Sequence, residues 1–208
     1  MLNDLGGAYF DLRRAEEALA CIRKALELHR AIGDRPGEVL GLNNLGIIYL
    51  ELDQFDRAID SGRQALALSR ETRDRRGEAS ALHGLGEVHR KRGRPEESLR
   101  CFEHSLALFR AINERRGECF ALQSIGETYH DLHRPAEGVY YVRRALAIRR
   151  RAGDRPGESE ALRTLGDLFA ETGQREAARQ AWRQALTILD DLGDPHADEI
   201  RDRLTHAL

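Results

Sequence analysis

Histidine and carboxylate side chains one helical turn apart are, by type and spacing, the residues of this chain best suited to hold a metal ion. His83 and Glu87 form one such pair, and Glu127 and His130 form another at similar positions later in the chain. Each pair would share one face of a helix. Zinc sites, however, combine several ligands at a fixed spacing, which neither pair has. We therefore expect solvated polar side chains and no metal site.

Two glycine patterns begin like nucleotide-binding loops. Gly41 and Gly46 are spaced as in a phosphate-binding loop, but Ile47 stands where that loop needs lysine, and no strand precedes it. Gly84 and Gly86 open a dinucleotide fingerprint in which a histidine replaces the third glycine. Both patterns are better explained by close packing of helices, so we expect no cofactor.

A hydrolase would need a nucleophile with a histidine and an acid to activate it. The sequence alone brings no such partners to its serines, so we predict no catalytic residue and no enzyme, and an enzyme is kept as the second class of function. The serines considered are Ser61, Ser69, Ser80 and Ser124.

Arginine clusters give a third hypothesis, in which the chain tracks a nucleic-acid backbone. The clusters at 73–76 and 149–151 are interleaved with or followed by acidic residues, and they lack aromatic residues for base stacking. A run of charge of this kind is usually a solvated face. The formal net charge of -2 adds no general attraction to nucleic acid or membrane, so we expect neither as a partner.

Composition and cysteine content favour a reducing compartment. The chain has 208 residues, of which 41% are hydrophobic and 33% charged, enough for a thin two-layer core. Its three cysteines, Cys21, Cys101 and Cys119, are odd in number and lack metal-ligand spacing. No signal peptide or membrane span is visible in the sequence. A cytoplasmic location is the resulting expectation.

These residues belong to a pattern that returns every forty positions. Each repeat has a glycine that follows a leucine or isoleucine and precedes, by three residues, an aromatic residue or histidine. In Leu42–Tyr49 these apolar positions share one helical face with a notch at the glycine. Glycine costs about 1 kcal/mol in a helix, so its recurrence indicates close approach of a second helix that carries spaced alanines. The repeated glycines are Gly6, Gly46, Gly86, Gly126 and Gly166.

This arrangement resembles the tetratricopeptide repeat, whose first helix carries a Leu-Gly step and a tyrosine and whose second helix carries alanines. The forty-residue unit, with Leu42–Gly46 and the connector Gly33–Glu38, is most similar to arrays of kinesin light chains, cell-polarity adaptors and bacterial signal-transduction ATPase regulators. The resemblance implies an all-α, right-handed superhelical solenoid of antiparallel helix pairs that binds proteins or peptides.

The period predicts a single solenoid over residues 1–208. Gly33 and Asp34 should end one helix and cap the next, with Pro36 in its first turn. Arg73 replaces the connector glycine and makes that connector atypical. The sequence opens inside a helix, which favours a fragment. The expected repeats are approximately 1–32, 33–72, 73–112, 113–152 and 153–192, followed by a capping helix at 193–208 with Ile200 and Leu204 facing inwards.

In that family the first helices line a concave groove, and the resemblance implies which positions face it. One row is polar and a second is partly acidic, whereas Ile47, Leu40, Leu50 and Phe10 would form an apolar patch. The predicted groove residues are Asn3, Asn43, Ile47, Leu50, His83, Glu87, Arg90, Gln123, Glu127, His130, Arg163 and Asp167, with Gly7, Phe120 and Glu160 beside them. At any single position a solvated helix face explains the polar residues equally well.

We therefore predict a non-catalytic signalling scaffold that binds a peptide or helix of a partner protein. Amide side chains would hold the partner backbone, apolar residues would take its hydrophobic anchors, and the aligned carboxylates Glu87, Glu127 and Asp167 would add their charges and select basic residues. A fragment of a larger bacterial regulator is the favoured parent, and a free-standing adaptor is the alternative. Self-association through the uncapped N-terminal end is also expected.

Overall fold

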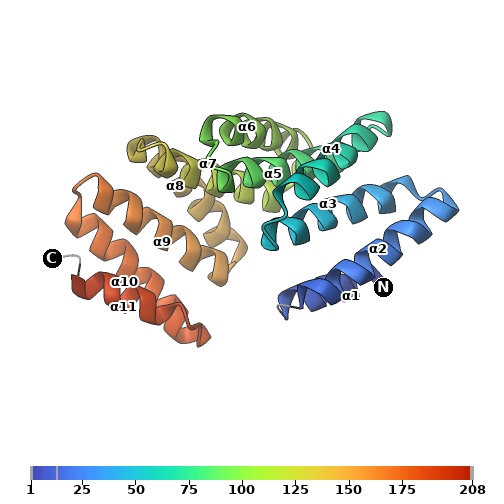
Figure 1. Ribbon diagram of the computed structural model, residues 1–208. Coiled ribbons are helices and arrows are strands. Elements are labelled where there is room, and N and C mark those ends of the chain that lie inside the picture. The colour runs from blue at the N-terminus through green and yellow to red at the C-terminus, as the bar shows by residue number, and fades with distance from the viewer. Residues whose placement is uncertain (1, 13, 207–208) are drawn as a thin grey trace. The chain divides into compact units, whose positions relative to one another are not determined.

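The computed structural model describes the backbone of residues 2–12 and 14–206 and the side chains of residues 5–10, 12 and 14–205. Within these ranges every regular element is an α-helix, which confirms the predicted all-α class. The helices are α1 (Leu2–Asp11), α2 (Ala15–Ile32), α3 (Arg35–Glu51), α4 (Phe55–Glu71), α5 (Arg75–Lys91), α6 (Pro95–Ala111), α7 (Arg115–Asp131), α8 (Pro135–Ala152), α9 (Arg155–Glu171), α10 (Arg175–Leu192) and α11 (Ala197–His206), as Figure 1 shows.

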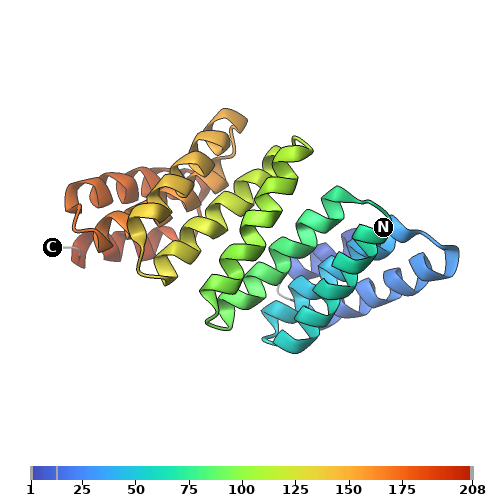
Figure 2. The same ribbon diagram turned by 90° about the horizontal axis from the view of Figure 1, so that it is seen from above.

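The chain divides by its contacts into two compact units, residues 1–114 with α1 to α6 and residues 115–208 with α7 to α11. Within each unit successive helices pack as antiparallel pairs, such as α5 with α6 and α9 with α10 (Figure 2). The second helix of one pair also packs on the first helix of the next, as α4 does on α5 and α8 on α9. Each unit is therefore a stacked helical repeat. One continuous superhelix over residues 1–208, and its handedness, stay predictions.

The connectors end and restart helices as predicted. Gly33 has a φ of 72°, the left-handed conformation that closes α2, and the Asp34 carboxylate accepts a hydrogen bond of 3.0 Å from the Gly37 amide at the start of α3. The Asp154 carboxylate caps α9 in the same way. Arg73 keeps the left-handed conformation without being a glycine, with a φ of 57°, so the atypical connector retains the common backbone path.

The glycine notch is confirmed at four of the five repeats. A Cβ atom on Gly126 of α7 would collide with the Val142 side chain of α8 and lie 3.2 Å from the Gly138 carbonyl oxygen. At Gly46 a Cβ would meet only ordinary contacts of 3.7 and 4.0 Å, because α4 carries Gly62 where Val142 stands in α8. Gly6, Gly86 and Gly166 lie against Ile22, Phe102 and Trp182, respectively.

The second helices supply the bulk of the core. Phe102, Val142 and Trp182 occupy one repeated position and are all buried, so side chains of very different size are accepted there. In α11, Ile200 is fully buried and Leu204 packs against the same cluster, as predicted. In the described part of the chain, none of the helices has the length and apolar character that a membrane crossing demands.

Candidate functional site

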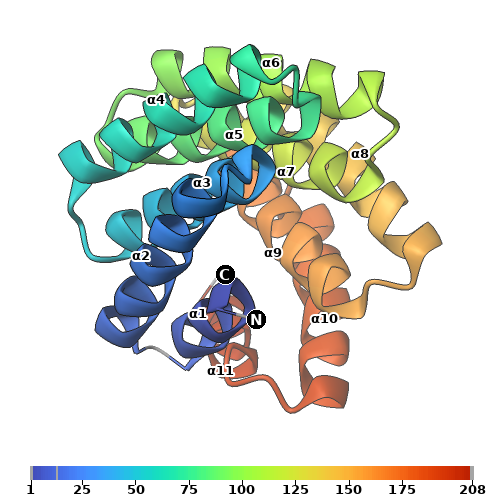
Figure 3. The same ribbon diagram turned by 90° about the vertical axis from the view of Figure 1, so that its right-hand side faces the viewer.

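In each unit the first helices of neighbouring pairs contact one another. α3 packs against α5, and α7 contacts α9. In unit 1, α4 and α6 lie on the outer side of α5 (Figure 3). We call the side formed by the first helices of a unit its inner face. The predicted groove residues with described side chains lie on these helices, with Asn43, Ile47 and Leu50 on α3, His83, Glu87 and Arg90 on α5, Gln123, Glu127 and His130 on α7, and Arg163 and Asp167 on α9. The side chain of Asn3 falls outside the described residues.

The predicted apolar patch is partly exposed in unit 1. Ile47 and Leu40 of α3 keep 48% and 49% of their surface accessible. Leu50 and Phe10 are half-buried and pack against the core cluster of the unit. Two of the four side chains are therefore available to a partner, and the other two mainly stabilise the repeat.

The carboxylates of the second row have partners within their own units. Glu87 lies 3.4 Å from the Arg90 guanidinium, and Asp167 accepts a hydrogen bond of 3.0 Å from the Trp182 indole nitrogen and an ion pair from Arg203. The expectation that these charges simply add is therefore wrong for Glu87 and Asp167, since each has an arginine beside it.

Gln123 and His83 differ from the solvated side chains that the polar row predicted. Gln123 is only 3% exposed, and its amide nitrogen donates to the Thr164 hydroxyl at 2.7 Å and to Glu127 at 3.0 Å. It thereby joins α7 to α9. The His83 ring lies 5.1 Å from the Phe102 ring. His130 is exposed, with its imidazole 3.4 Å from Glu171.

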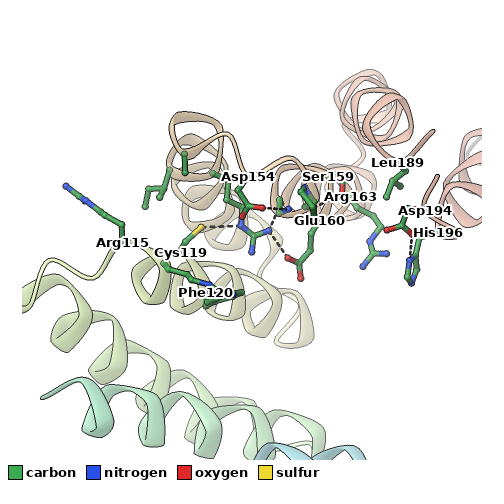
Figure 4. A pocket seen from close by; sticks show the side chains of 16 residues that line it. Arg115, Cys119, Phe120, Asp154, Ser159, Glu160, Arg163, Leu189, Asp194 and His196 are labelled. Carbon is green, nitrogen blue, oxygen red and sulfur yellow. Dashed lines mark hydrogen bonds and ion pairs between the residues drawn. The ribbon is translucent and has the colours of Figure 1, made fainter. Parts of the chain in front are cut away.

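An open cleft of about 720 Å³ lies within unit 2, and sequence reasoning did not predict it as a pocket (Figure 4). The starts of α7 and α9, the end of α8 and the segment between α10 and α11 contribute to its walls. Of the predicted groove residues, it contains Arg163, with Phe120 and Glu160 from the neighbouring positions. We call this cleft the α7–α9 pocket. Its other lining residues include Arg115, Arg116, Cys119, Ile148, Arg149, Asp154, Pro156, Ser159, Leu189, Asp194 and His196.

Arg149 organises one wall of the α7–α9 pocket, although it is only 3% exposed. Its guanidinium donates to the Glu160 carboxylate at 2.7 Å, to the Cys119 sulfur at 3.2 Å and to the Gly157 carbonyl oxygen. Burial opposes its charge, but Glu160 and Cys119 outweigh that effect and raise the pKa of Arg149. The arginine is thus a fixed, charged strut between α7, α8 and α9.

The sequence did contain a signal for this strut. At the forty-residue period, the positions equivalent to Arg149 are His29, Ser69, Phe109 and Leu189, and three of these four side chains, those of Ser69, Phe109 and Leu189, are buried and uncharged. An arginine in such a row must find buried partners or leave an uncompensated charge. The row therefore could have indicated a polar feature in repeat four.

The rim of the α7–α9 pocket combines an aromatic ring with polar groups. Phe120 is 44% exposed, and the Arg116 guanidinium lies 5.7 Å from its ring centre. On the other side Asp194 accepts hydrogen bonds from the backbone and ring nitrogens of His196, and these lower the pKa of Asp194. Arg163 faces Asp194. Among the described residues, none makes a hydrogen bond or a contact ion pair with the Arg163 guanidinium. The pocket thus offers an apolar surface beside an available guanidinium.

The cysteine of the pocket is a poor nucleophile. Burial raises the pKa of the Cys119 thiol, even though Arg149 acts in the opposite direction. Its sulfur donates to the Ala145 carbonyl oxygen at 3.4 Å. In the described part of the chain, no three histidine, cysteine or acidic side chains are grouped as metal ligands would be. Cys119 is thus a buried thiol held between α7 and α8.

The sequence profile named Tetratricopeptide repeat matches residues 1–71, 42–111, 77–137 and 118–191, which together span most of the chain. The chain belongs to the tetratricopeptide repeat family. A comparison with curated protein sequences gave no match.

Solved structures with this fold are similar to the tetratricopeptide repeat chain at low sequence identity. A putative kinesin light chain from Podosopora anserina has a TM-score of 0.71 at 16% identity, covering 92% of this chain and 94% of that one. BtubC (BKLC) from P. vanneervenii has a TM-score of 0.78 at 18% identity, covering 94% and 81%. A Rap protein complexed with Competence and Sporulation Factor has a TM-score of 0.86 at 16% identity, covering 99% and 61%. The chain thus spans under two thirds of the Rap protein's length.

Proposed function

We propose that this tetratricopeptide repeat chain is a non-catalytic scaffold that binds a peptide segment of another protein on its inner face, with the α7–α9 pocket as the main contact. The observation that carries the proposal is an open pocket of about 720 Å³ with an exposed aromatic ring at its rim. Peptide sites typically combine such apolar anchors with a few directed polar groups. The Rap protein with the same fold is complexed with Competence and Sporulation Factor, which supports a bound partner.

In this proposal two kinds of contact in the pocket contribute to peptide binding. An apolar side chain of the peptide packs on Phe120 and Leu189, and the Arg163 guanidinium donates hydrogen bonds to an acceptor group of the peptide. Arg149 touches no peptide atom and instead fixes the positions of Glu160 and the start of α9. The exposed Ile47 and Leu40 give unit 1 a second apolar contact surface.

The test uses peptides selected from a random displayed library on the immobilised full chain. The best peptide is then measured by fluorescence anisotropy against the wild type, Phe120→Asp and Arg163→Glu. Loss of a buried anchor contact should weaken binding by about tenfold or more in the first variant, and Arg163→Glu should weaken it in the same direction.

Leu28→Asp is the matched control, because Leu28 is an exposed leucine on the second helix α2, away from the inner face. Its affinity should equal that of the wild type. Equal affinities for Phe120→Asp and Leu28→Asp would show that the peptide binds elsewhere, and failure to select any peptide would contradict the scaffold function itself.

A further inference from the structure

We propose that unit 2 has a second docking surface on its outer side, a cleft between α8 and α10 that receives an acidic protein segment carrying apolar side chains. α9 packs against both helices and lies between them (Figure 1). Its side chains form the floor of the cleft. The cleft has a volume of about 590 Å³. Its floor consists of Leu162, Leu165 and Phe169. We call it the α8–α10 cleft. It shares no lining residue with the α7–α9 pocket.

The α8 wall carries positive charge that no described carboxylate pairs with. Arg143 and Arg151 are exposed and line the cleft, and Arg144 lies one position further along α8. Arg143 lies 5.4 Å from the Phe169 ring centre, and Arg144 donates to the Tyr140 hydroxyl at 2.9 Å. Among the described residues no carboxylate pairs with any of these three arginines. Their charges are therefore available to a partner.

The opposite wall adds no negative charge. On α10 the lining residues are alanines and glutamines, of which Gln184 accepts a hydrogen bond of 3.0 Å from Arg150. Arg150 also pairs with Glu158 at 2.8 Å, so it is the neutralised arginine of the lining. The lining thus contains three arginines and no carboxylate, in a chain whose formal net charge is -2. The lining is therefore basic in a chain that is slightly acidic as a whole.

The residues on the floor of the cleft favour an acidic protein segment over a nucleic acid as its ligand. Phosphate groups need cations, and single-stranded nucleic acid also needs accessible aromatic faces for its bases. Here Phe169 is nearly buried and Arg143 lies over it, so its ring cannot stack on a base. The apolar side chains of the lining that stay accessible are those of Ala147 and Ala177, which match a small apolar side chain of a protein segment. An acidic segment would place that side chain between these alanines and its carboxylates beside Arg143 and Arg151.

The test measures the fluorescence anisotropy of a labelled synthetic peptide in which glutamate and leucine alternate at helical spacing, with the full chain as receptor. The wild type should bind it, and the double variant Arg143→Glu/Arg151→Glu should weaken binding by about tenfold or more because both attractions become repulsions. Arg143→Gln/Arg151→Gln should weaken it less, in the same direction. The matched control is Arg175→Glu, an exposed arginine in the first turn of α10 that does not line the cleft.

Three results would overturn the proposal. The wild type could fail to bind the peptide at all. The double variants and Arg175→Glu could weaken binding equally, which would indicate a general charge effect. A peptide with serine in place of leucine, or a single-stranded DNA oligonucleotide, could bind as tightly, which would identify the cleft as a site for any polyanion. Phe120→Asp should leave binding unchanged, and this separates the cleft from the proposed peptide pocket.

Discussion

At the scale of single residues, a glycine of the first helix lies against a bulky residue of the second helix in four of the five repeats. Gly126 has no room for a methyl group because Val142 is stiff at its branched carbon and the Gly138 carbonyl belongs to the backbone. Gly126→Ala should therefore lower the free energy of unfolding by about 1–3 kcal/mol, despite the better helix propensity of alanine. Chemical denaturation measures this change.

Gly46→Ala is the matched control for that prediction, because a Cβ at Gly46 has ordinary contacts. Here only helix propensity acts, so the free energy of unfolding should rise by about 0.5–1 kcal/mol. If both variants changed stability in the same direction, the close-packing role of the glycine row would be wrong.

His89 makes the stability of repeat three sensitive to pH. It stands where other repeats have tyrosine or phenylalanine, and burial lowers its pKa below the ordinary value, although Glu97 at 3.1 Å opposes this and Arg94 adds to it. The folded chain then binds this proton less readily than the unfolded chain does. Stability should consequently fall as the pH drops through about 6.5, the ordinary histidine pKa.

The variant His89→Tyr should make the melting temperature fall less steeply between about pH 7.5 and 5.5 than it does in the wild type. His104→Tyr, at an exposed position of α6, serves as the control and should keep the wild-type slope. An unchanged slope in His89→Tyr would show that carboxylates alone set the pH dependence.

At the scale of elements, α11 stabilises unit 2 by covering the last helix pair. Ile200 is fully buried in the cluster that includes Trp182, and Arg203 pairs with Asp167 of α9. Ile200→Ala should lower the free energy of unfolding by about 2–5 kcal/mol, because it removes buried methyl groups and leaves a cavity. Thermal melting followed by circular dichroism measures the loss. Glu199→Ala, at the exposed neighbour, should melt like the wild type.

The elements themselves were predictable because they follow from local spacing. The glycine row, the alanines of the second helix and connectors such as Gly33–Asp34 together fix where helices end and which faces meet. Whether a groove side chain is exposed, buried or paired depends on partners from other elements. Thr164 of the next repeat accepts a hydrogen bond from the buried Gln123, and Arg203, far along the chain, pairs with Asp167. Neither contact follows from a repeated phase.

At the scale of the whole molecule, the family and the stacked helix pairs were predictable, and the site was predictable only in part. Repeat phase put Arg163, Phe120 and Glu160 among the predicted groove positions, and these three residues line the α7–α9 pocket. That a partner binds there stays a proposal. The pocket also depends on Arg149, which stands where Ser69, Phe109 and Leu189 are buried and uncharged, and on the segment that follows α10. Such a departure shows in the sequence as a break in a repeated row, but the partners that the side chain finds do not follow from the repeat.

The most direct test of the account is a backbone amide NMR titration of the full chain with the selected peptide. We predict that the largest chemical-shift changes lie at Phe120, at Arg163 and between Asp194 and His196, with small changes along the outer faces of α8 and α10. Changes confined to the outer helices or to the connectors, with the α7–α9 pocket unaffected, would contradict the proposed function.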